Sequence, residues 1–379
     1  KMMNEKEYQD LSFNDIADPF FLSRREFLKL LGGGIFVFFA STEPWAMFQE
    51  AQRRTLGRDY PTDFNAYLRI AEDGRVTCFA GKAELGQGVQ TSFAQIAAEE
   101  LDVTLDSVDM IMGDTDLCPW DMGTFGSRSI KYFGPSLRQA AAEARAILVQ
   151  LASEYLKIPA EKLLTKDGIV FDKENPKNQV SYGFLAKGKI IERHMDPKPP
   201  VKSSSEYKIS GKPAGRKDAA LKVSGKAEYA GDIRIPGMAY ARILRPPAHG
   251  AKLKSVDLLE AEKIKDAQII RDGEMIAVLH ASFDEAEKVL SKIKAEYDMP
   301  GATVNDQTIY EHLVKVAPQG EIIEEKGNLE EGRKLASSIY EETYFTPYVA
   351  HAPVEPHTAL VKVEGERALV WASTQRPFG

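Results

Sequence analysis

The sequence predicts an α+β fold of layered domains, and three observations support this class. Strand-like and helical patterns alternate in the first half of the chain, a long alanine-rich helix is expected at 135–156, and short strands with one amphipathic helix recur between residues 240 and 293. The length of 379 residues and the hydrophobic content of 43% are enough for two or three domains with sizeable cores.

The N-terminal stretch has the pattern of an export signal. Ser23–Lys29 places Arg24 and Arg25 ahead of the apolar run Leu30–Ala40, and paired arginines before a short apolar run are typical of twin-arginine signals. An amphipathic helix is the alternative, but the run is apolar on every face. The run is also short for a membrane-spanning helix, which needs about twenty residues. Residues 1–48 are therefore expected to be an export signal or membrane anchor of a periplasmic protein.

A hairpin opens the first folded domain. Alternating apolar residues at 67–70 and 76–80 flank a turn at 72–74, as expected for two paired strands. A helix follows, because apolar residues between Phe93 and Leu101 recur three and four positions apart. A further strand is expected at 108–112, before the long helix.

A glycine turn, Gly86-Gln87-Gly88, lies between the second strand and the first helix. Free backbone N–H groups at a helix start attract anions, so the turn is a candidate seat for phosphate. A P-loop is excluded because no Lys-Ser/Thr pair follows, and a dinucleotide fingerprint because Thr91 replaces its third glycine. A second loop of small residues, Gly123–Ser129, leads into the long helix. The two loops together suit one extended phosphate-bearing ligand.

The second half of the chain predicts a smaller sheet with one helix. A linker at 197–217, rich in Pro, Lys, Ser and Gly, precedes short strands at 240–244, 267–271 and 275–279. A helix is expected at 282–292, because its apolar positions share one face.

Two blocks of sequence carry a resemblance to a known family. Gly81–Thr91 (GKAELGQGVQT) followed by Gly123–Ser129 (GTFGSRS) resembles the molybdopterin-binding part of the large subunits of the xanthine dehydrogenase and aldehyde oxidase family. Lys222–Asp232, with Pro236–Ala241 and Leu244–His249, is similar to the hammerhead domain of the same subunits.

A third block agrees with the first two. His351–Ala359 with Val370–Phe378 resembles the opening of the main cofactor domain of these subunits. With a Gly-Gln-Gly block ahead of the hammerhead, the order is that of the branch containing the beta subunits of isoquinoline 1-oxidoreductase. The matches span residues 65–379, and their joint occurrence is more specific than any one of them.

The resemblance also implies a domain order. Residues 1–48 would be the signal or anchor, 64–196 a molybdopterin-binding-like layered domain, 214–300 a hammerhead α/β domain, 301–338 a charged linker, and 339–379 the start of a second, main molybdopterin-binding domain.

The residues implied to bind the cofactor act through hydrogen bonds and close backbone approach, because the pterin's own dithiolene sulfurs hold the molybdenum. Gln87 would bond the pterin, Gly126 would lie nearest the metal, and Gln375 would bond the oxo group of the metal as the catalytic residue. Arg128 either holds phosphate or bridges domains. Singly, each has an ordinary alternative as a turn, a cap or a buried polar group. The full implied set is Gly86, Gln87, Gly88, Thr124, Phe125, Gly126, Ser127, Arg128 and Gln375.

The implied cofactor is molybdopterin, in its cytosine dinucleotide form, with molybdenum. The implied reaction oxidises an aldehyde or an aromatic N-heterocycle, with water as the oxygen source. The family's general base, a glutamate late in the large subunit, has no counterpart before Gly379. The sequence is therefore expected to be either a fragment or one half of a split large subunit, with the active site completed elsewhere. The expected partners are the second half of the large subunit, a small subunit with 2Fe-2S clusters and, as often in exported members of the family, a cytochrome c subunit. A non-catalytic docking subunit is the alternative.

Other residues narrow the function. The net charge of −7 argues against a nucleic-acid partner. Cys78 and Cys118 are too few for an iron–sulfur cluster, and they either pair or remain buried thiols. The histidines and glutamate at 351–357 match no common metal-ligand spacing, so no protein metal site is expected. Glu99 and Glu100 lie on the first predicted helix and are expected on a solvated face.

Overall fold

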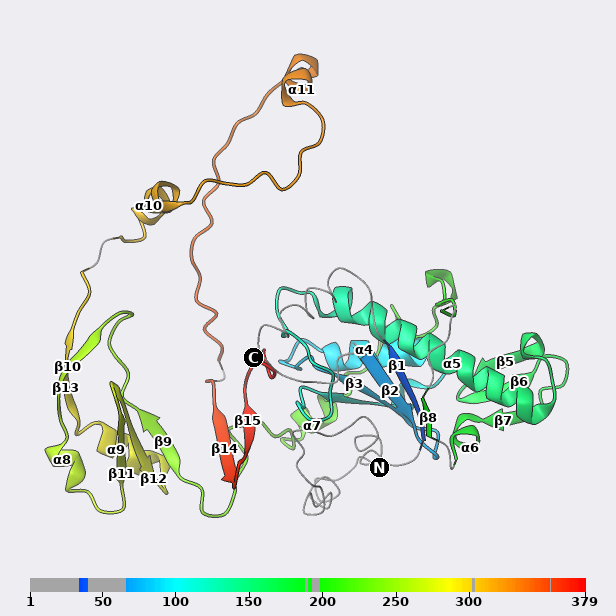
Figure 1. Cartoon of the computed structure of the whole chain (residues 1–379), viewed down its shortest axis with the longest axis horizontal. Coiled ribbons are helices and arrows are strands. Elements are labelled where there is room, and N and C mark those ends of the chain that lie inside the picture. The colour runs from blue at the N-terminus through cyan, green and yellow to red at the C-terminus, as the bar shows by residue number, and fades with distance from the viewer. Residues whose placement is uncertain (1–33, 40–65, 188–189, 193–197, 302–303, 355) are drawn as a thin grey trace. The chain divides into compact units, whose positions relative to one another are not determined.

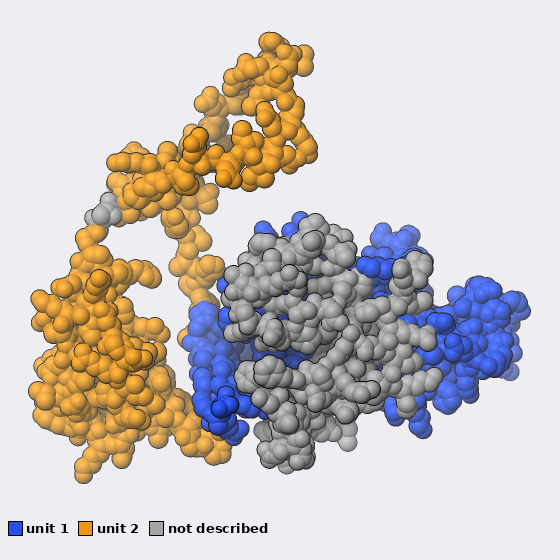
Figure 2. All heavy atoms as spheres, viewed as in Figure 1, with its two compact units in different colours: residues 1–231, 357–379 blue, residues 232–356 orange. Residues whose placement is uncertain are grey.

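The computed structural model describes the chain except for residues 1–33, 40–65, 188–189, 193–197, 302–303 and 355. Two compact units are present: Lys1–Gly231 with His357–Gly379 forms unit 1, and Asp232–Pro356 forms unit 2 (Figure 2). Helices and strands mix in both units, which confirms the predicted α+β class.

Unit 1 is built on a five-stranded sheet of order β4-β3-β2-β1-β8. The strands are β1 (Gly34–Phe39), β2 (Ala66–Ile70), β3 (Val76–Ala80), β4 (Val108–Met112) and β8 (Ile190–Glu192). The pairs β1/β2 and β2/β3 are antiparallel, whereas β3/β4 and β1/β8 are parallel. The hairpin β2–β3 and the strand β4 are those that the sequence predicts.

Two helices cover this sheet (Figure 1). Helix α4 (Val89–Leu101) joins β3 to the parallel strand β4, and α5 (Gly134–Leu156) is the predicted alanine-rich helix. The alanines of α5 other than Ala146 have no solvent exposure, so the helix can pack closely, while Phe93 and Phe133 contact each other with ring centroids 4.8 Å apart. The short π-helical turn η4 (Ser129–Phe133) leads into α5.

A small sheet follows α5. It has the order β5-β6-β7, from β5 (Leu163–Lys166), β6 (Ile169–Asp172) and β7 (Gln179–Ser181), and helix α6 (Tyr182–Ala186) follows. The fully buried Tyr182 donates its hydroxyl proton to the Leu101 carbonyl at 2.7 Å and so ties this tail to α4. Short helices complete this part: η3 (Leu105–Ser107), η5 (Ala160–Lys162), η6 (Ser204–Glu206) and α7 (Ala219–Val223).

The last residues of the chain also belong to unit 1. A hairpin of β14 (Ala359–Glu364) and β15 (Arg367–Ala372) precedes an irregular segment, 373–379, which packs against the loop at 119–124. Phe378 in this segment is only 1% exposed. Sequence patterns did not predict the hairpin as a pair of strands.

Unit 2 contains a three-stranded sheet of order β11-β12-β9 and one covering helix. Strands β9 (Tyr240–Ile243), β11 (Gln268–Asp272) and β12 (Met275–His280) and helix α9 (Phe283–Leu290) agree with the predicted elements. Apolar residues of β12 and α9 form the centre of its core. The hammerhead assignment itself stays a prediction.

Several elements of unit 2 are not predicted from the sequence. β10 (Lys252–Asp257) pairs with β13 (Lys294–Asp298), and α8 (Leu259–Glu262) follows β10. The predicted surface connection contains two short helices, α10 (Ile309–Val316) and α11 (Leu329–Leu335), neither with a buried residue. Charged residues surround both helices in the sequence, so no clear apolar pattern indicates where the helices begin and end.

The N-terminal export prediction lies largely outside the described residues, since Arg24 and Arg25 are among those not described. Part of the apolar run that follows forms β1, in which Ile35 is fully buried. Among the helices that the structure describes, none is long and apolar enough to cross a membrane.

Candidate functional site

Three segments far apart in the sequence meet in unit 1. The Ala83 N–H donates to Thr124 Oγ1 at 2.8 Å, and the Thr124 N–H donates to the Gln375 carbonyl at 2.8 Å. Gln87 also bonds to Ala83, because its Nε2 donates to the Ala83 carbonyl at 3.0 Å. The glycine turn, the loop at 123–128 and the segment around Gln375 are therefore joined by a short path of hydrogen bonds.

The buried base of this junction is an ion pair. Lys82 and Asp121 are 3% and 5% exposed, and Lys82 Nζ lies 2.7 Å from Asp121 Oδ1. Lys82 Nζ also donates to the Gly123 carbonyl at 2.7 Å, and the Gly123 N–H donates to Asp121 Oδ1 at 2.8 Å. The sequence singles out neither charge, although Lys82 lies inside the first family-like block.

Most of the implied cofactor-binding residues are exposed, above this buried base. Thr124 is buried, whereas Gln87, Gln375 and the four residues 125–128 are exposed. Gly126 and Ser127 both have φ near +60°, which turns the chain sharply at the tip of the loop. The Arg128 guanidinium carbon lies 5.9 Å from the centroid of the Tyr132 ring.

The glycine turn differs from the predicted phosphate seat in one respect. Glu84 Oε1 accepts from the N–H groups of Gly86 and Gly88 at 2.9 and 2.8 Å, and Glu84 Oε2 accepts from the Gln90 N–H at 2.9 Å. The N–H groups that the sequence suggests are free for an anion thus bond to a carboxylate of the same loop. Anions and carboxylates favour this place for the same reason, the exposed donors of a helix start.

The Gln87 side chain also stabilises its own turn. Its Oε1 accepts from the Leu85 N–H at 2.6 Å, while its Nε2 donates to Ala83 as described. Gly86 has φ +101°, and no atom lies within 4 Å of where a Cβ would be. The backbone at Gly86 is therefore open to close approach by a ligand.

Arg216 adds a positive charge beside this turn, and sequence patterns did not indicate it. Its Nη1 donates to the Gly86 carbonyl at 2.8 Å, and its Nη2 lies 3.7 Å from Glu84 Oε1. Asp218 accepts two hydrogen bonds from the same guanidinium and pairs with Lys222, which together hold the pKa of the Asp218 carboxyl well below its usual range. In the sequence, the only signal for Arg216 is its position in a basic linker.

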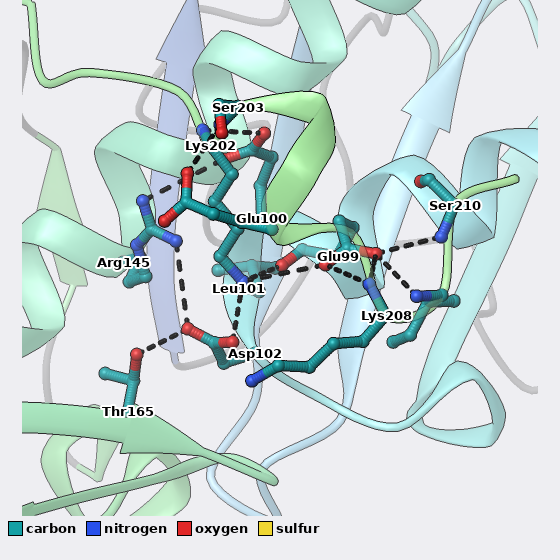
Figure 3. Close-up of polar contacts among 12 residues, drawn as sticks. Glu99, Glu100, Leu101, Asp102, Arg145, Thr165, Lys202, Ser203, Lys208 and Ser210 are labelled. Atoms are coloured by element: carbon teal, nitrogen blue, oxygen red, sulfur yellow. Dashed lines mark hydrogen bonds and ion pairs between the residues drawn. The ribbon is translucent and has the colours of Figure 1, made fainter.

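The prediction that Glu99 and Glu100 occupy a solvated face is wrong. They are 3% and 1% exposed, because the linker 198–212 covers that side of α4 (Figure 3). Glu99 accepts from the N–H groups of Lys208, Ile209 and Ser210, and Glu100 from the Arg138 side chain. The partners lie at least 38 residues away in sequence, so local periodicity does not reveal them.

Neighbouring charges extend this cluster. Asp102 accepts a hydrogen bond from Thr165 Oγ1 and pairs with Lys202 Nζ, both at 2.6 Å (Figure 3). Arg145 Nη1 lies 3.7 Å from Asp102 Oδ2, and Arg145 Nη2 lies 3.8 Å from Glu100 Oε2. The cluster fastens the linker to α4 and α5. It lies apart from the hydrogen-bonded path at the glycine turn, because no described contact joins the two.

Cys78 and Cys118 are free, buried thiols, which decides between the two readings left open by the sequence. Burial raises the pKa of the Cys78 thiol to about 12, with a smaller contribution from the charge of Asp109. Burial likewise raises the pKa of the Cys118 thiol. Neither group has the thiolate character of a reactive cysteine.

The groups near Gln87, Thr124 and Gln375 suit a cofactor that brings its own metal ligands. They offer amide, hydroxyl and backbone groups, which bind organic ligands by hydrogen bonds. Among the described residues, no group of three or more His, Cys, Asp or Glu side chains is placed to hold a metal ion. The His357 ring nitrogen instead contacts the Ser373 carbonyl at 3.2 Å.

Comparison with known proteins agrees with this picture. Two profiles of the molybdopterin cofactor-binding domain match residues 23–225 and 314–379. The chain is 30% identical to a component of the nicotinate dehydrogenase of Pseudomonas putida over 82% of this chain and 27% of that protein. It is 28% identical to a membrane-bound aldehyde dehydrogenase, named for pyrroloquinoline quinone, of Gluconacetobacter polyoxogenes over 89% and 46%.

A third relative is the beta subunit of isoquinoline 1-oxidoreductase from Brevundimonas diminuta, 30% identical over 51% of this chain and 30% of that protein. The matched regions cover between 27% and 46% of the lengths of these three relatives. Both profile matches include residues of the hydrogen-bonded path, Ala83 and Thr124 in the first and Gln375 in the second. The chain belongs to the xanthine dehydrogenase and aldehyde oxidase family and corresponds to part of its molybdopterin-binding large subunit.

Proposed function

We propose that this chain is part of an exported molybdenum hydroxylase that oxidises an aldehyde or an aromatic N-heterocycle with oxygen from water. The observation that carries the proposal is the path Ala83–Thr124–Gln375, which brings together residues from both matched regions. The substrate class is supported by the names of the relatives, which refer to nicotinate, isoquinoline and aldehydes.

In this proposal the chain's own residues bind and orient the cofactor. The open backbone of Gly86 would admit the pterin, and Gln87 would donate a hydrogen bond to it with the Nε2 proton that does not bond to Ala83. The loop 124–128 would line the phosphate and the metal side of the cofactor, and Gln375 would hydrogen-bond the oxo group of the metal. When bound, the molybdenum cofactor supplies the two-electron oxidation of the substrate carbon.

The proposal includes parts that lie outside these residues. The general-base glutamate and the second half of the large subunit would lie either in the remainder of the same protein or in a companion polypeptide. Electrons would pass to 2Fe-2S clusters on a small subunit, and then to a cytochrome c. We expect the cytosine dinucleotide form of the cofactor.

Export to the periplasm is proposed from Arg24, Arg25 and the apolar run after them. The twin-arginine route carries folded proteins, and this suits a chain that receives a cytoplasm-made cofactor before it crosses the membrane. A fusion of residues 1–48 to a reporter would test it. Export that is lost on replacing both arginines by lysine supports this address, and unchanged export contradicts it.

The test of the function is metal and pterin analysis of the complex purified from its host. We expect molybdenum and, after oxidation, a fluorescent pterin; the absence of both contradicts the proposal. Gln87→Ala and Gln375→Ala should each lower turnover at least tenfold, the scale of one lost hydrogen bond to the transition state. Gln319→Ala, at an exposed position of unit 2, is the matched control.

One observation favours the alternative of a docking subunit. The turn satisfies its own donors through Glu84 and Gln87, so it keeps its shape by itself. If the molybdenum content and turnover of the complex are unchanged in both glutamine variants, the docking role is the better account.

A further inference from the structure

The buried pair Lys82–Asp121 does more than neutralise two charges. Asp121 Oδ1 accepts both from Lys82 Nζ and from the Gly123 N–H, while Lys82 Nζ also donates to the Gly123 carbonyl. The pair therefore bonds to the donor and the acceptor of a single residue. Two apolar side chains of similar volume would fill the same space but could not hold Gly123 in this way.

The backbone at Gly123 leaves no room for a side chain. Its φ is +131°, and an added Cβ would lie 2.7 Å from the Phe125 ring, 2.8 Å from Arg376 Cγ and 3.0 Å from the Gln375 carbonyl. Only glycine fits there. The residue thus packs directly against the Gln375 segment on one side and leads into the exposed loop 124–128 on the other.

The residues that follow Lys82 and Gly123 in the sequence continue this contact between the two segments. Lys82 precedes Ala83, whose N–H holds Thr124, and Gly123 precedes Thr124, whose N–H holds Gln375. Gly81, just before Lys82, also lies against this loop, because a Cβ there would be 2.4 Å from the Pro119 carbonyl. The end of β3 and the loop 119–124 are therefore aligned over three consecutive residues, with the ion pair at the centre.

We propose that Lys82 and Asp121 are positioning residues for the cofactor site. They set the place of the loop 123–128 relative to the glycine turn and to Gln375, and they act through Gly123 without touching the cofactor. This inference rests on the proposed function. It names residues that determine whether the cofactor is retained, beyond those that contact it.

The test uses the complex purified from its host and three variants. Lys82→Met/Asp121→Leu removes both buried charges and keeps an apolar fill, while Asp121→Asn keeps an acceptor near the Gly123 N–H but leaves the buried Lys82 charge without its carboxylate. Glu100→Gln is the matched control, since it weakens another buried ion pair of unit 1 that does not contact the loop. Molybdenum and pterin per protein are measured together with thermal unfolding.

We expect the double variant to unfold within a few degrees of the wild type and to retain at least tenfold less molybdenum and pterin. Asp121→Asn should lose the cofactor faster on dialysis, whereas Glu100→Gln should unfold earlier and, while folded, retain the cofactor. Should the double variant not fold, the comparison of Asp121→Asn with Glu100→Gln decides.

Two results overturn the positioning role. One is full cofactor content in the double variant and in Asp121→Asn, and the other is a loss of cofactor that follows unfolding temperature alike in Asp121→Asn and Glu100→Gln. A wild-type complex without molybdenum or pterin contradicts the proposed function instead, so the two failures are distinguishable.

Discussion

At the scale of single residues, the buried charges of unit 1 are each satisfied by specific partners. Glu99 and Glu100 are adjacent on α4; Glu99 accepts from three backbone N–H groups of the linker, and Glu100 accepts from the Lys202 N–H and from the Arg138 side chain. A buried carboxylate is tolerated only when its lone pairs are occupied. The position of the linker is therefore determined by these acceptors.

Glu99→Ala is expected to lower the free energy of unfolding of unit 1 by about 3–5 kcal/mol, because three backbone N–H groups of the linker lose their acceptor. Chemical denaturation would measure it. Glu154→Ala, at an exposed position of α5, is the control and should change stability by less than about 0.5 kcal/mol. Equal effects of the two changes would contradict the role given to Glu99.

The cysteines give a prediction about pH. Because the pKa of Cys78 is raised to about 12 by burial, the folded protein keeps this thiol protonated where an unfolded chain, with a thiol pKa of about 8.5, loses the proton. The contribution to stability is therefore complete below about pH 8.5 and declines as pH rises toward 12.

Chemical denaturation at pH 8 and pH 10 would check the fall in stability, and alkylation at pH 8 followed by mass spectrometry would check the burial of the two thiols. We expect both Cys78 and Cys118 to stay unmodified in the native protein and to react fully in denaturant. Rapid labelling of either thiol under native conditions would contradict the burial described here.

At the scale of elements, patterns of local sequence predict much of the architecture. The hairpin β2–β3, the helices α4 and α5 and the sheet β11-β12-β9 follow from apolar spacing, because each buries one face against a neighbour in its own unit. Strands β10, β13, β14 and β15 escaped prediction. None of their residues is buried, and their side chains are only half-buried or exposed, so these strands lack the strongly apolar face that marks the other strands in the sequence.

The candidate site could be predicted only in part. Local sequence indicates the glycine turn and the loop 123–129, the resemblance to the family adds Gln375, and the structure joins them through Ala83 and Thr124. The roles of Lys82 and Arg216 could not be derived, because their partners Asp121 and Gly86 are 39 and 130 residues away in sequence. Glu84 bonds to neighbours in its own loop, but only the turn conformation directs their N–H groups at its carboxylate. A charged residue in isolation is expected on the surface.

Strand β1 gives a prediction that bears on export. The apolar run expected to be an export segment includes Gly34–Phe39, which lies between β2 and β8 in the sheet. Removal of residues 1–39 would expose an edge of β2 and the surface that Ile35 covers, and is expected to lower the unfolding temperature of unit 1 by several degrees. Removal of residues 1–33, which keeps β1, is the comparison. Equal unfolding temperatures for the two truncations would show that β1 is dispensable.

At the scale of the whole molecule, the chain leaves unit 1 at Gly231 and returns to it at His357. The returning segment is not peripheral, because Phe378 is buried and Gln375 accepts from Thr124. Residues from the two matched domain profiles therefore meet in unit 1. A substitution that disturbs the packing of the final segment should therefore destabilise the loop 119–124, more than a hundred residues earlier in the sequence.

Phe378→Ala tests this return directly. The ring is 1% exposed and lies where a Cβ on Gly81 would be 3.1 Å from it, so truncation leaves a cavity beneath the end of β3 and is expected to lower the stability of unit 1 by about 3–5 kcal/mol. Hydrogen exchange should become faster in the loop 119–124 and stay unchanged in β11 and β12 of unit 2. Tyr340→Ala, at a 90% exposed ring, is the control and should alter neither. Faster exchange in unit 2 alone would mean that the final segment stabilises a different part of the molecule.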